Sequence, residues 1–454
     1  MPSARMLIVA MLICGTPPAA LSASSQPAFD AYIRPYADTN NFSGAVLVAR
    51  AGKILFDQAY GVANAAAELP NTRTTCFHIA SMSMQFTAAG VLRLVEEGKL
   101  TLDTHVDDIV PQIPNGSKIA IRHLLEETSG LPDANALPDY GQVLKEHQTP
   151  GSLVQLIRNK EPRAAPGDPS SSEEHSSFNL LALITEKLTG TSFAEAQRQL
   201  VFKPLGMANS GIDHDQKLPA ACALGYAPIG VRDLQLAEQI KWSAKTGNAS
   251  AYSTVGDEMK WVSGLFERQF LNEKLRAALL DYSTGHVGYG WFKSVNKRFG
   301  VPVYYMNGRA PGFASFLAYI PSERLTVVVL SNIYASTPTT IGLDLAAIAL
   351  GKDYATVHLT PGPLRDDGVA RDAGSYKFGA NFYQADATLI LSVKNGNAML
   401  HWPSAETTAL VPVDGGDYID RAYWVPVSFH RNTDGAATEL IYAGFSGQRL
   451  LPAK

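Results

Sequence analysis

Ser81 is the residue of this sequence whose type and position most clearly suggest chemistry. It precedes an apolar segment, 82–97, in which hydrophobic residues recur at helical spacing before Gly98. A serine hydroxyl is a weak nucleophile unless a neighbouring base takes its proton, and a helix places residue i+3 on the same side as residue i. That residue is Met84, whose thioether is not a base. Three interpretations stay open: a working nucleophile, a relic of one, or a serine that only caps the helix.

His175 is the candidate for a replacement base. With Glu173 or Glu174 beside it, it could imitate the Ser-His-acid arrangement that recurs on unrelated folds. The competing interpretation is that 170–177 forms a solvated acidic loop with a surface histidine. The sequence alone favours the loop, because serine, proline and acidic residues dominate this stretch.

The elements that must position these side chains are two helices. The segment 82–97 has apolar residues around most of its circumference, which predicts a buried helix with Ser81 at its first turn. The same spacing predicts a second helix over 177–188, ended by Gly190. The region 161–176 between them has the composition of a loop.

Strand patterns lie at both ends of the same region. A hairpin is predicted over 44–60, with its turn at 51–53. Three further strands are predicted over 301–306, 313–319 and 325–330, separated by short turns. We therefore expect an α/β (α+β) domain, in which one antiparallel sheet is built from both ends of the domain and a helical subdomain is inserted between them.

The chain divides into four predicted segments. Residues 1–22 have the layout of a cleavable export signal, and a retained anchor is the alternative. The larger domain is expected over 27–355, and a linker rich in proline and glycine over 356–366. Short alternating strands over 367–454 predict a small antiparallel β domain, either a sandwich or a barrel.

Composition narrows the classes of function. The chain has 454 residues and a net charge of −4, with no basic stripe, so nucleic acid is not an expected partner. Outside the signal the cysteines are Cys76 and Cys222, which an oxidising compartment allows to pair, although the sequence does not say whether they do. Their spacing is not that of metal ligands, so we expect neither metal nor cofactor. The location expected is periplasmic or secreted, with no membrane span after signal removal.

Four stretches between about residues 40 and 335 together resemble a known family. They are 77–100, 121–131, 204–207 and 308–313, the last containing Pro311-Gly312-Phe313. In this order they are similar to the marks of the serine β-lactamase and penicillin-binding-protein family, in its class C β-lactamase, D-peptidase and esterase branch. The resemblance implies the fold described above and acyl transfer to a serine, here Ser81. The β domain is only weakly similar to an appendage that some members carry.

The resemblance also identifies three degenerate motif positions. The family's lysine three residues after the serine is Met84 here. Its tyrosine and asparagine fall on Glu173 and His175, or on Ser172 and Glu174 if the count starts from Pro166-Gly167. The lysine or histidine of its third motif falls on Met306.

Gly308 and Arg309 complete the third motif. The glycine lets the backbone approach a ligand, and the amides of Ser81 and Arg309 are the expected oxyanion hole. The Arg309 side chain could bind a substrate carboxylate, but we expect it to point to solvent. The tripeptide Lys245-Thr246-Gly247 repeats the third motif by letters. We interpret it as a coincidence in a polar loop, because no strand precedes it and no Pro-Gly-Phe follows.

The sequence thus predicts a family member that is catalytically impaired and keeps a cleft for a small-molecule or peptidoglycan-like ligand, or for a protein partner. The alternative is an active esterase, amidase or β-lactam-type hydrolase that uses Ser81 with a non-standard base such as His175. In a third interpretation the β domain carries the function and the larger domain is its scaffold.

Overall fold

The structure is a computed structural model. It describes residues 26–168, 175–281, 287–356, 359, 369–394, 396–404, 406–413 and 417–450. The predicted signal over 1–22 and most of the predicted linker over 356–366 lie outside these ranges, so both stay predictions. No helix in the described ranges is long and apolar enough to cross a membrane.

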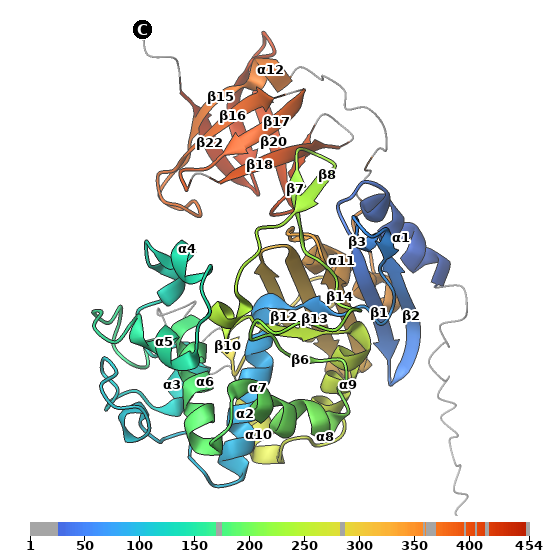
Figure 1. The fold of residues 1–454 in the computed structure, drawn as a ribbon. Helices are drawn as coiled ribbons and strands as arrows, with labels where there is room; N and C mark the ends of the chain where they lie inside the picture. The colour runs from blue at the N-terminus through green and yellow to red at the C-terminus, as the bar shows by residue number, and fades with distance from the viewer. Residues whose placement is uncertain are drawn as a thin grey trace, which may run out of the picture.

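The larger domain is built on a seven-stranded antiparallel sheet assembled from both ends of the domain, as predicted (Figure 1). Its strand order is β10-β11-β12-β13-β14-β1-β2. The bounds are β10 Val287–Gly288, β11 Trp291–Val295, β12 Pro302–Ala310, β13 Phe313–Ile320, β14 Leu325–Ser331, β1 Gly44–Arg50 and β2 Lys53–Tyr60. The N-terminal hairpin joins the C-terminal strands where β1 pairs with β14, from Gly44 opposite Ser331 to Arg50 opposite Leu325.

Both faces of this sheet are covered. Along β1, Ala45 and Leu47 belong to the core on the side of α2, whereas Val46 and Val48 belong to the core on the side of α1 and α11. This alternation follows from the period of two in a strand. The covering helices are α1 Gln26–Asp38, α2 Ser83–Glu96, α9 Val255–Phe266 and α11 Thr337–Leu350. The result is a three-layered domain.

The inserted helical subdomain packs against α2. Its longest helix, α6, is two residues longer at its N-terminus than the predicted 177–188 and begins at His175. Other elements between β2 and β10 include α3 Ile121–Leu125, η3 Ala134–Ala136, α4 Tyr140–Val143, α5 Pro150–Gln155, α7 Phe193–Gln197, α8 Lys203–Leu205, η5 Trp242–Lys245, β9 Ala251–Ser253 and α10 Glu273–Leu279. The hairpin of β7 Tyr226–Ile229 and β8 Asp233–Leu236 extends from this domain toward the C-terminal one (Figure 1).

The C-terminal domain is a closed eight-stranded barrel, which decides between the two predicted forms. Its strands are β15 Gly374–Lys377, β16 Thr388–Lys394, β17 Asn397–His401, β18 Thr407–Pro412, β19 Tyr418–Asp420, β20 Val425–Arg431, β21 Ala437–Tyr442 and β22 Phe445–Arg449. Pairing of β15 with β22 closes it, and a core of aromatic and aliphatic side chains fills it.

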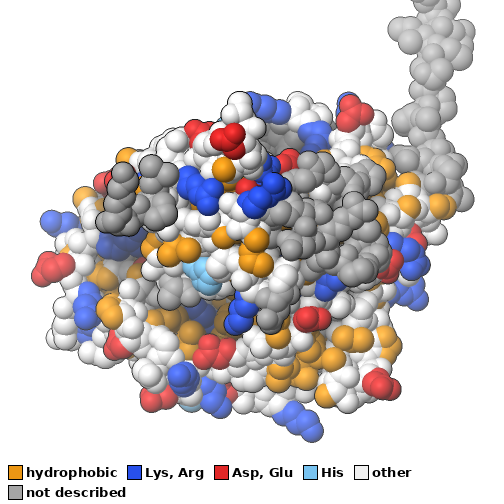
Figure 2. Space-filling model, turned by 90° about the horizontal axis from the view of Figure 1, so that it is seen from above, with side chains coloured by type: hydrophobic (Ala, Val, Ile, Leu, Met, Phe, Trp, Pro, Cys, Tyr) orange, Lys and Arg blue, Asp and Glu red, His pale blue; other side chains and the backbone are white. Residues whose placement is uncertain are grey.

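The barrel is joined to the larger domain by a buried contact. Trp424 packs on Tyr36 of α1 with ring centroids 5.4 Å apart. Arg421 is buried and donates hydrogen bonds to the Asn41 side chain and to the carbonyl groups of residues 40, 229, 230 and 233. Seen from the barrel side, the surface carries interspersed acidic, basic and apolar side chains (Figure 2).

Candidate active site

The backbone immediately before Ser81 is strained. Ser81 lies in a short 3-10 turn, Ala80–Met82, directly before α2, and Ala80 has a φ of +51° although it carries a Cβ. A left-handed alanine costs on the order of 1 kcal/mol, and such strain persists where the surroundings impose it. Strained residues of this kind cluster at functional sites.

Hydrogen bonds hold the two carbonyl groups that directly precede Ser81 in the chain. The Ser315 hydroxyl donates to the Ile79 carbonyl at 2.6 Å, and the Ser83 hydroxyl donates to the Ala80 carbonyl at 2.7 Å. The Ser83 oxygen in turn accepts from the Ala251 amide at 2.9 Å. The orientation of the Ser81 amide is therefore imposed by strands β13 and β9.

Gly308 allows β12 to approach this turn. A Cβ at Gly308 would lie 2.4 Å from the Ile79 oxygen and 2.7 Å from the Ser81 nitrogen, so no larger residue fits without movement. The pairing of β12 with β11 ends at Tyr305, which leaves this part of β12 paired on the β13 side. The close approach agrees with an oxyanion hole made by the amides of Ser81 and Arg309, which stays a prediction.

A pocket of about 240 Å³ opens at Ser81. It is lined by groups that donate, accept or carry charge, from segments far apart in the sequence. Those that matter for chemistry are Ser81, Tyr140, His175, Lys245, Asn248 and Arg309. Ser81 and His175, both predicted as site residues, are thus brought together, whereas Glu173 lies outside the described residues.

His175 is the first residue of α6 and is paired with an acid. Its Nδ1 lies 3.1 Å from Asp133 Oδ2, and the other oxygen of Asp133 accepts from the Asn135 amide at 3.1 Å. The sequence analysis offered Glu173 or Glu174 as the acid. Both of these glutamates lie outside the described residues, so that assignment stays a prediction. The acid that the structure places on His175 is Asp133, which precedes η3 and which no local pattern connects with position 175. The loop predicted over 170–177 is wrong for 175–177, because His175 begins a helix and lines the pocket, whereas 170–174 lie outside the described residues.

Lys245 is the site residue that the sequence analysis missed. It is the last residue of η5, and its Nζ lies 4.7 Å from the centre of the Tyr140 ring. Burial lowers the pKa of its ammonium group to about 8, and the nearby Asp133 carboxylate partly opposes this shift. The tripeptide 245–247 lies away from the strand before Pro311, which agrees with the sequence analysis. Its lysine nevertheless lines the Ser81 pocket.

The two methionines at degenerate motif positions are core residues. Met84 on α2 and Met306 on β12 are both buried in the hydrophobic core between the sheet and α2. Neither is among the residues that line the pocket. The positions at which the resemblance implied basic groups are therefore filled by apolar packing.

We expected the Arg309 side chain to point to solvent. It packs against the barrel instead. Its guanidinium carbon lies 3.9 Å from the centre of the Tyr334 ring and 4.6 Å from that of Tyr423. Its Nη2 is 3.8 Å from a carboxylate oxygen of Glu406. Because Glu406 and Tyr423 belong to the barrel, the C-terminal domain holds one cationic side chain of the pocket wall.

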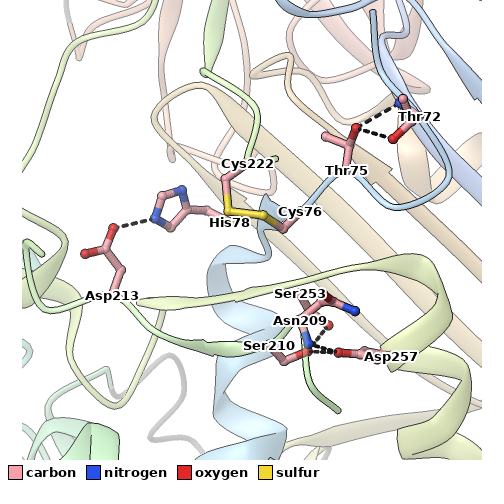
Figure 3. The surroundings of a disulfide bond; sticks show 10 residues. All are labelled: Thr72, Thr75, Cys76, His78, Asn209, Ser210, Asp213, Cys222, Ser253 and Asp257. Atoms are coloured by element: carbon pink, nitrogen blue, oxygen red, sulfur yellow. Dashed lines mark hydrogen bonds and ion pairs between the residues drawn. A yellow bond between two sulfur atoms is a disulfide. The ribbon is translucent and has the colours of Figure 1, made fainter. Parts of the chain in front are cut away.

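A disulfide between Cys76 and Cys222 braces the segment that leads to Ser81 (Figure 3). The sequence left this pairing open. Two residues further on, His78 bonds to Asp213 at 2.9 Å and stacks on Trp242 with ring centroids 3.7 Å apart. Burial lowers the pKa of His78, which favours its neutral form. No group of three or more metal-ligating side chains occurs in the described part of the chain.

The fold and the site together define a serine acyl-transfer scaffold. It consists of an antiparallel sheet, a buried helix preceded by Ser81 and the strained Ala80, and a strand whose Gly308 lies against the Ser81 turn. The Beta-lactamase family profile matches residues 29–351, so the chain belongs to this family. Among curated relatives it is 24% identical to Penicillin-binding protein 4* of Bacillus subtilis over 92% of this chain and 96% of that protein. It is 28% identical to D-aminopeptidase of Gluconobacter oxydans, over 70% of this chain and 61% of that protein.

Solved structures agree on the fold. The penicillin-binding protein from Bacillus halodurans superposes with a TM-score of 0.62 at 28% identity, over 71% of this chain and 98% of that one. The octameric penicillin-binding protein homologue from Pyrococcus abyssi superposes with a TM-score of 0.64 at 21% identity, over 93% of this chain and 99% of that one. The second match extends over nearly the whole chain.

Proposed function

We propose that this protein is a slow serine hydrolase that transfers an acyl group from a small ester or amide to Ser81 and then to water. The observation that carries the proposal is the shared pocket, in which Ser81 lies with the His175–Asp133 pair and Lys245. A nucleophile, proton-exchanging groups and backbone amides near the nucleophile are the parts that acyl transfer requires.

The strained turn supports a retained nucleophile. Ala80 keeps a positive φ, and Gly308 keeps the close approach to the Ser81 amide. A serine that served only as a helix cap would need neither feature. Both features orient the neighbouring amides of Ser81 and Arg309, the donor pair proposed to stabilise the oxyanion, and such a donor contributes roughly 10²–10³-fold.

The rate is expected to be low compared with family members that have all three motifs. A positioned acid or base is worth roughly 10²–10⁴-fold, and groups that act as a unit lose most of their joint effect when one is missing. Met84 and Met306 supply no such group. We therefore expect weak or negligible turnover of β-lactams and slow turnover of activated esters.

The substrate class follows from the pocket and from the relatives. A volume of about 240 Å³ fits only the groups next to the bond that is cleaved, because drug-sized ligands need about 300–1,000 Å³. The relatives named above are penicillin-binding proteins and a D-aminopeptidase, and a D-amino acid amidase from Ochrobactrum anthropi shares the fold. Short D-amino acid amides and esters and peptidoglycan-like fragments are the substrates to test first.

The proposed location is the periplasm or the exterior of the cell. The predicted export signal and the Cys76–Cys222 disulfide both support it, because disulfides persist in oxidising compartments. Penicillin-binding relatives are consistent with a substrate from the cell wall.

Intact-mass measurement tests the function. The protein is incubated separately with a fluorophosphonate, an activated ester and a β-lactam, and the mass of the adduct is followed with time. We expect a stoichiometric fluorophosphonate adduct and a transient acyl adduct from the ester, both absent in Ser81→Ala. A wild-type protein that gives no adduct with any of the three probes would contradict the proposal.

The second candidate is a cleft that binds a ligand without acylation. This candidate is favoured because buried methionines, Met84 and Met306, occupy the two positions at which the resemblance implied basic groups. Calorimetric binding of D-amino acid amides by a protein that forms no Ser81 adduct would support this candidate and contradict the hydrolase.

A further inference from the structure

We propose that Lys245 is the general base that accepts the proton of Ser81, from a segment unrelated to the position of Met84. This inference rests on the proposed function and names the group that activates the nucleophile. It concerns a residue in the connection before β9, whereas the resemblance placed basic groups at positions 84 and 306. The base would therefore have changed its place in the fold while the nucleophile kept its own.

The position of Lys245 is fixed from both helices that border the pocket. The Thr87 hydroxyl of α2 donates to the Gly247 carbonyl at 2.7 Å, and the Asn179 amide of α6 donates to the Thr246 carbonyl at 2.7 Å. On the other side of the lysine, the Tyr140 hydroxyl donates to the Ala244 carbonyl at 3.0 Å. Because α2 follows Ser81 directly, the lysine segment is tied to the nucleophile's own helix.

Gly247 makes this attachment close. It has a φ of +90°, and a Cβ there would lie 2.2 Å from the Phe178 carbonyl oxygen. The backbone can therefore pass between α2 and α6 only with glycine at this position. This requirement gives the tripeptide 245–247 a structural reason for its glycine, independent of any motif.

Lys245 has no carboxylate partner in the part of the chain that the structure describes. Its Nζ lies 4.7 Å from the centre of the Tyr140 ring, and Asp133 acts on it only as a nearby charge. A partly buried lysine is usually paired, since an isolated ammonium group loses hydration. Here the lysine and Ser81 line the same pocket of about 240 Å³, and the inferred proton transfer takes place across it.

Burial makes a fraction of Lys245 available as the neutral amine near neutral pH. Burial lowers its pKa to about 8, so that roughly a tenth of the molecules hold the neutral form at pH 7. The other titratable or charged groups that line the pocket are Tyr140, His175, Arg309 and Tyr334, with Asp133 behind the histidine. The Asp133 carboxylate favours the protonated form of Lys245 and so partly opposes the effect of burial on its pKa.

In the inferred reaction, one proton passes from the Ser81 hydroxyl to Lys245 and from Lys245 to the leaving group. The neutral amine of Lys245 takes the proton of the Ser81 hydroxyl while Oγ forms a bond to the acyl carbon, and the carbonyl electron pair moves to its oxygen. That oxyanion is stabilised by the backbone amides of Ser81 and Arg309. When the oxyanion collapses, the bond to the leaving group breaks, and the ammonium of Lys245 returns the proton to that group. Water then hydrolyses the acyl-serine by the same sequence.

The test compares acylation rates across pH in the full-length protein. Stopped-flow measurement of the first turnover with an activated ester is made from pH 5.5 to 10 for the wild type, Lys245→Met and Lys245→Arg. For the wild type we expect the rate to rise with pH, with a midpoint near 8. Both variants should lose about 10²–10⁴-fold and lose that alkaline rise. The arginine variant keeps the charge but cannot act as a base, so it separates proton transfer from anion binding.

Controls keep the outcomes distinct. Lys241→Met, at an exposed lysine four residues earlier, should leave rate and pH profile unchanged, and thermal unfolding shows whether each variant is folded. In Lys245→Ala, added methylamine should restore part of the rate, which a purely structural role would not produce. A folded Lys245→Met protein that keeps the wild-type rate and midpoint overturns the inference while the hydrolase stands. Loss of the alkaline rise in His175→Gln alone overturns it as well, whereas a wild type without any Ser81 adduct overturns the function itself.

Discussion

Ser81 and its neighbours show which residues of this site can be recognised in a sequence and which cannot. The serine, Gly308 and the buried character of the following helix are local, because helical spacing and a turn before Phe313 identify them. Asp133 and Lys245 are not local. Each meets the pocket through contacts between segments far apart in the chain. No local pattern marks Asp133, and we set aside the tripeptide that contains Lys245 because no strand precedes it.

The substitution Met84→Lys tests whether a lysine three residues after Ser81 is sufficient for fast acylation. Met84 is buried in the apolar core and does not line the pocket. We expect Met84→Lys alone to give no fast β-lactam acylation, because the groups of the other two motifs are still missing. We also expect it to lower the free energy of unfolding by about 1–3 kcal/mol, since an ammonium group replaces an apolar side chain. Intact mass with a β-lactam and urea unfolding measure the two effects.

The predicted and observed elements differ mainly at their ends. The buried helix predicted over 82–97 is Ser83–Glu96, and the strand predicted over 301–306 continues to Ala310. The longer strand matters, because its extension holds Gly308 and Arg309 beside the nucleophile. Periodicity predicts the middle of an element well, but its ends depend on tertiary contacts, here the contact of β12 with the Ser81 turn.

The contact between α2 and α9 contains a buried acid. Gln85 of α2 donates to Glu258 of α9 at 3.2 Å, and the Trp261 indole donates to Gln85 at 2.8 Å. Burial raises the pKa of Glu258 to about 8. Because the folded pKa is raised, the unfolded chain releases this proton at lower pH than the folded one. This group's contribution to stability therefore falls as pH rises from about 4.5 to 8.

Replacing this acid by its amide tests that contact. Glu258→Gln removes the titrating group and keeps its size, so it should raise the free energy of unfolding by about 1–3 kcal/mol at pH 7. Near pH 4, where the carboxyl is protonated in both states, the two proteins should differ little. Urea unfolding of both proteins from pH 4 to 8 measures this, and a stability difference independent of pH would contradict the assignment.

On the scale of the whole molecule, two links hold distant parts of the chain around the pocket. The disulfide joins residues 146 positions apart, and Arg421 anchors the barrel on the larger domain. Neither link has a sequence signal: cysteine count allows the first, and an arginine in a strand-rich domain does not indicate the second. The barrel itself was predictable from alternating strands, but its closure and its contact with Arg309 depend on the complete fold.

Removal of the disulfide should destabilise the larger domain. Cross-linking a loop of this length restricts the unfolded chain, and native disulfides contribute about 2–5 kcal/mol. The double variant Cys76→Ser, Cys222→Ser is therefore expected to unfold at lower temperature than the wild type. Dithiothreitol should shift the wild type toward the variant and leave the variant unchanged. Equal unfolding temperatures for wild type and variant would contradict a stabilising role.

The anchoring of the barrel gives the last prediction. The guanidinium group of Arg421 is buried and bonded to four backbone carbonyl groups and the Asn41 side chain, so its removal leaves these acceptors unpaired between the two domains. In Arg421→Ala we expect the barrel to unfold separately, seen as a second calorimetric transition, while Arg34→Ala, at an exposed ion pair with Asp30, keeps one. The barrel also holds Arg309 through Tyr423, so the Arg421 variant should show altered acylation of Ser81 even though residue 421 does not line the pocket. A single transition with an unchanged acylation rate would show that the barrel neither depends on this anchor nor influences the site through it.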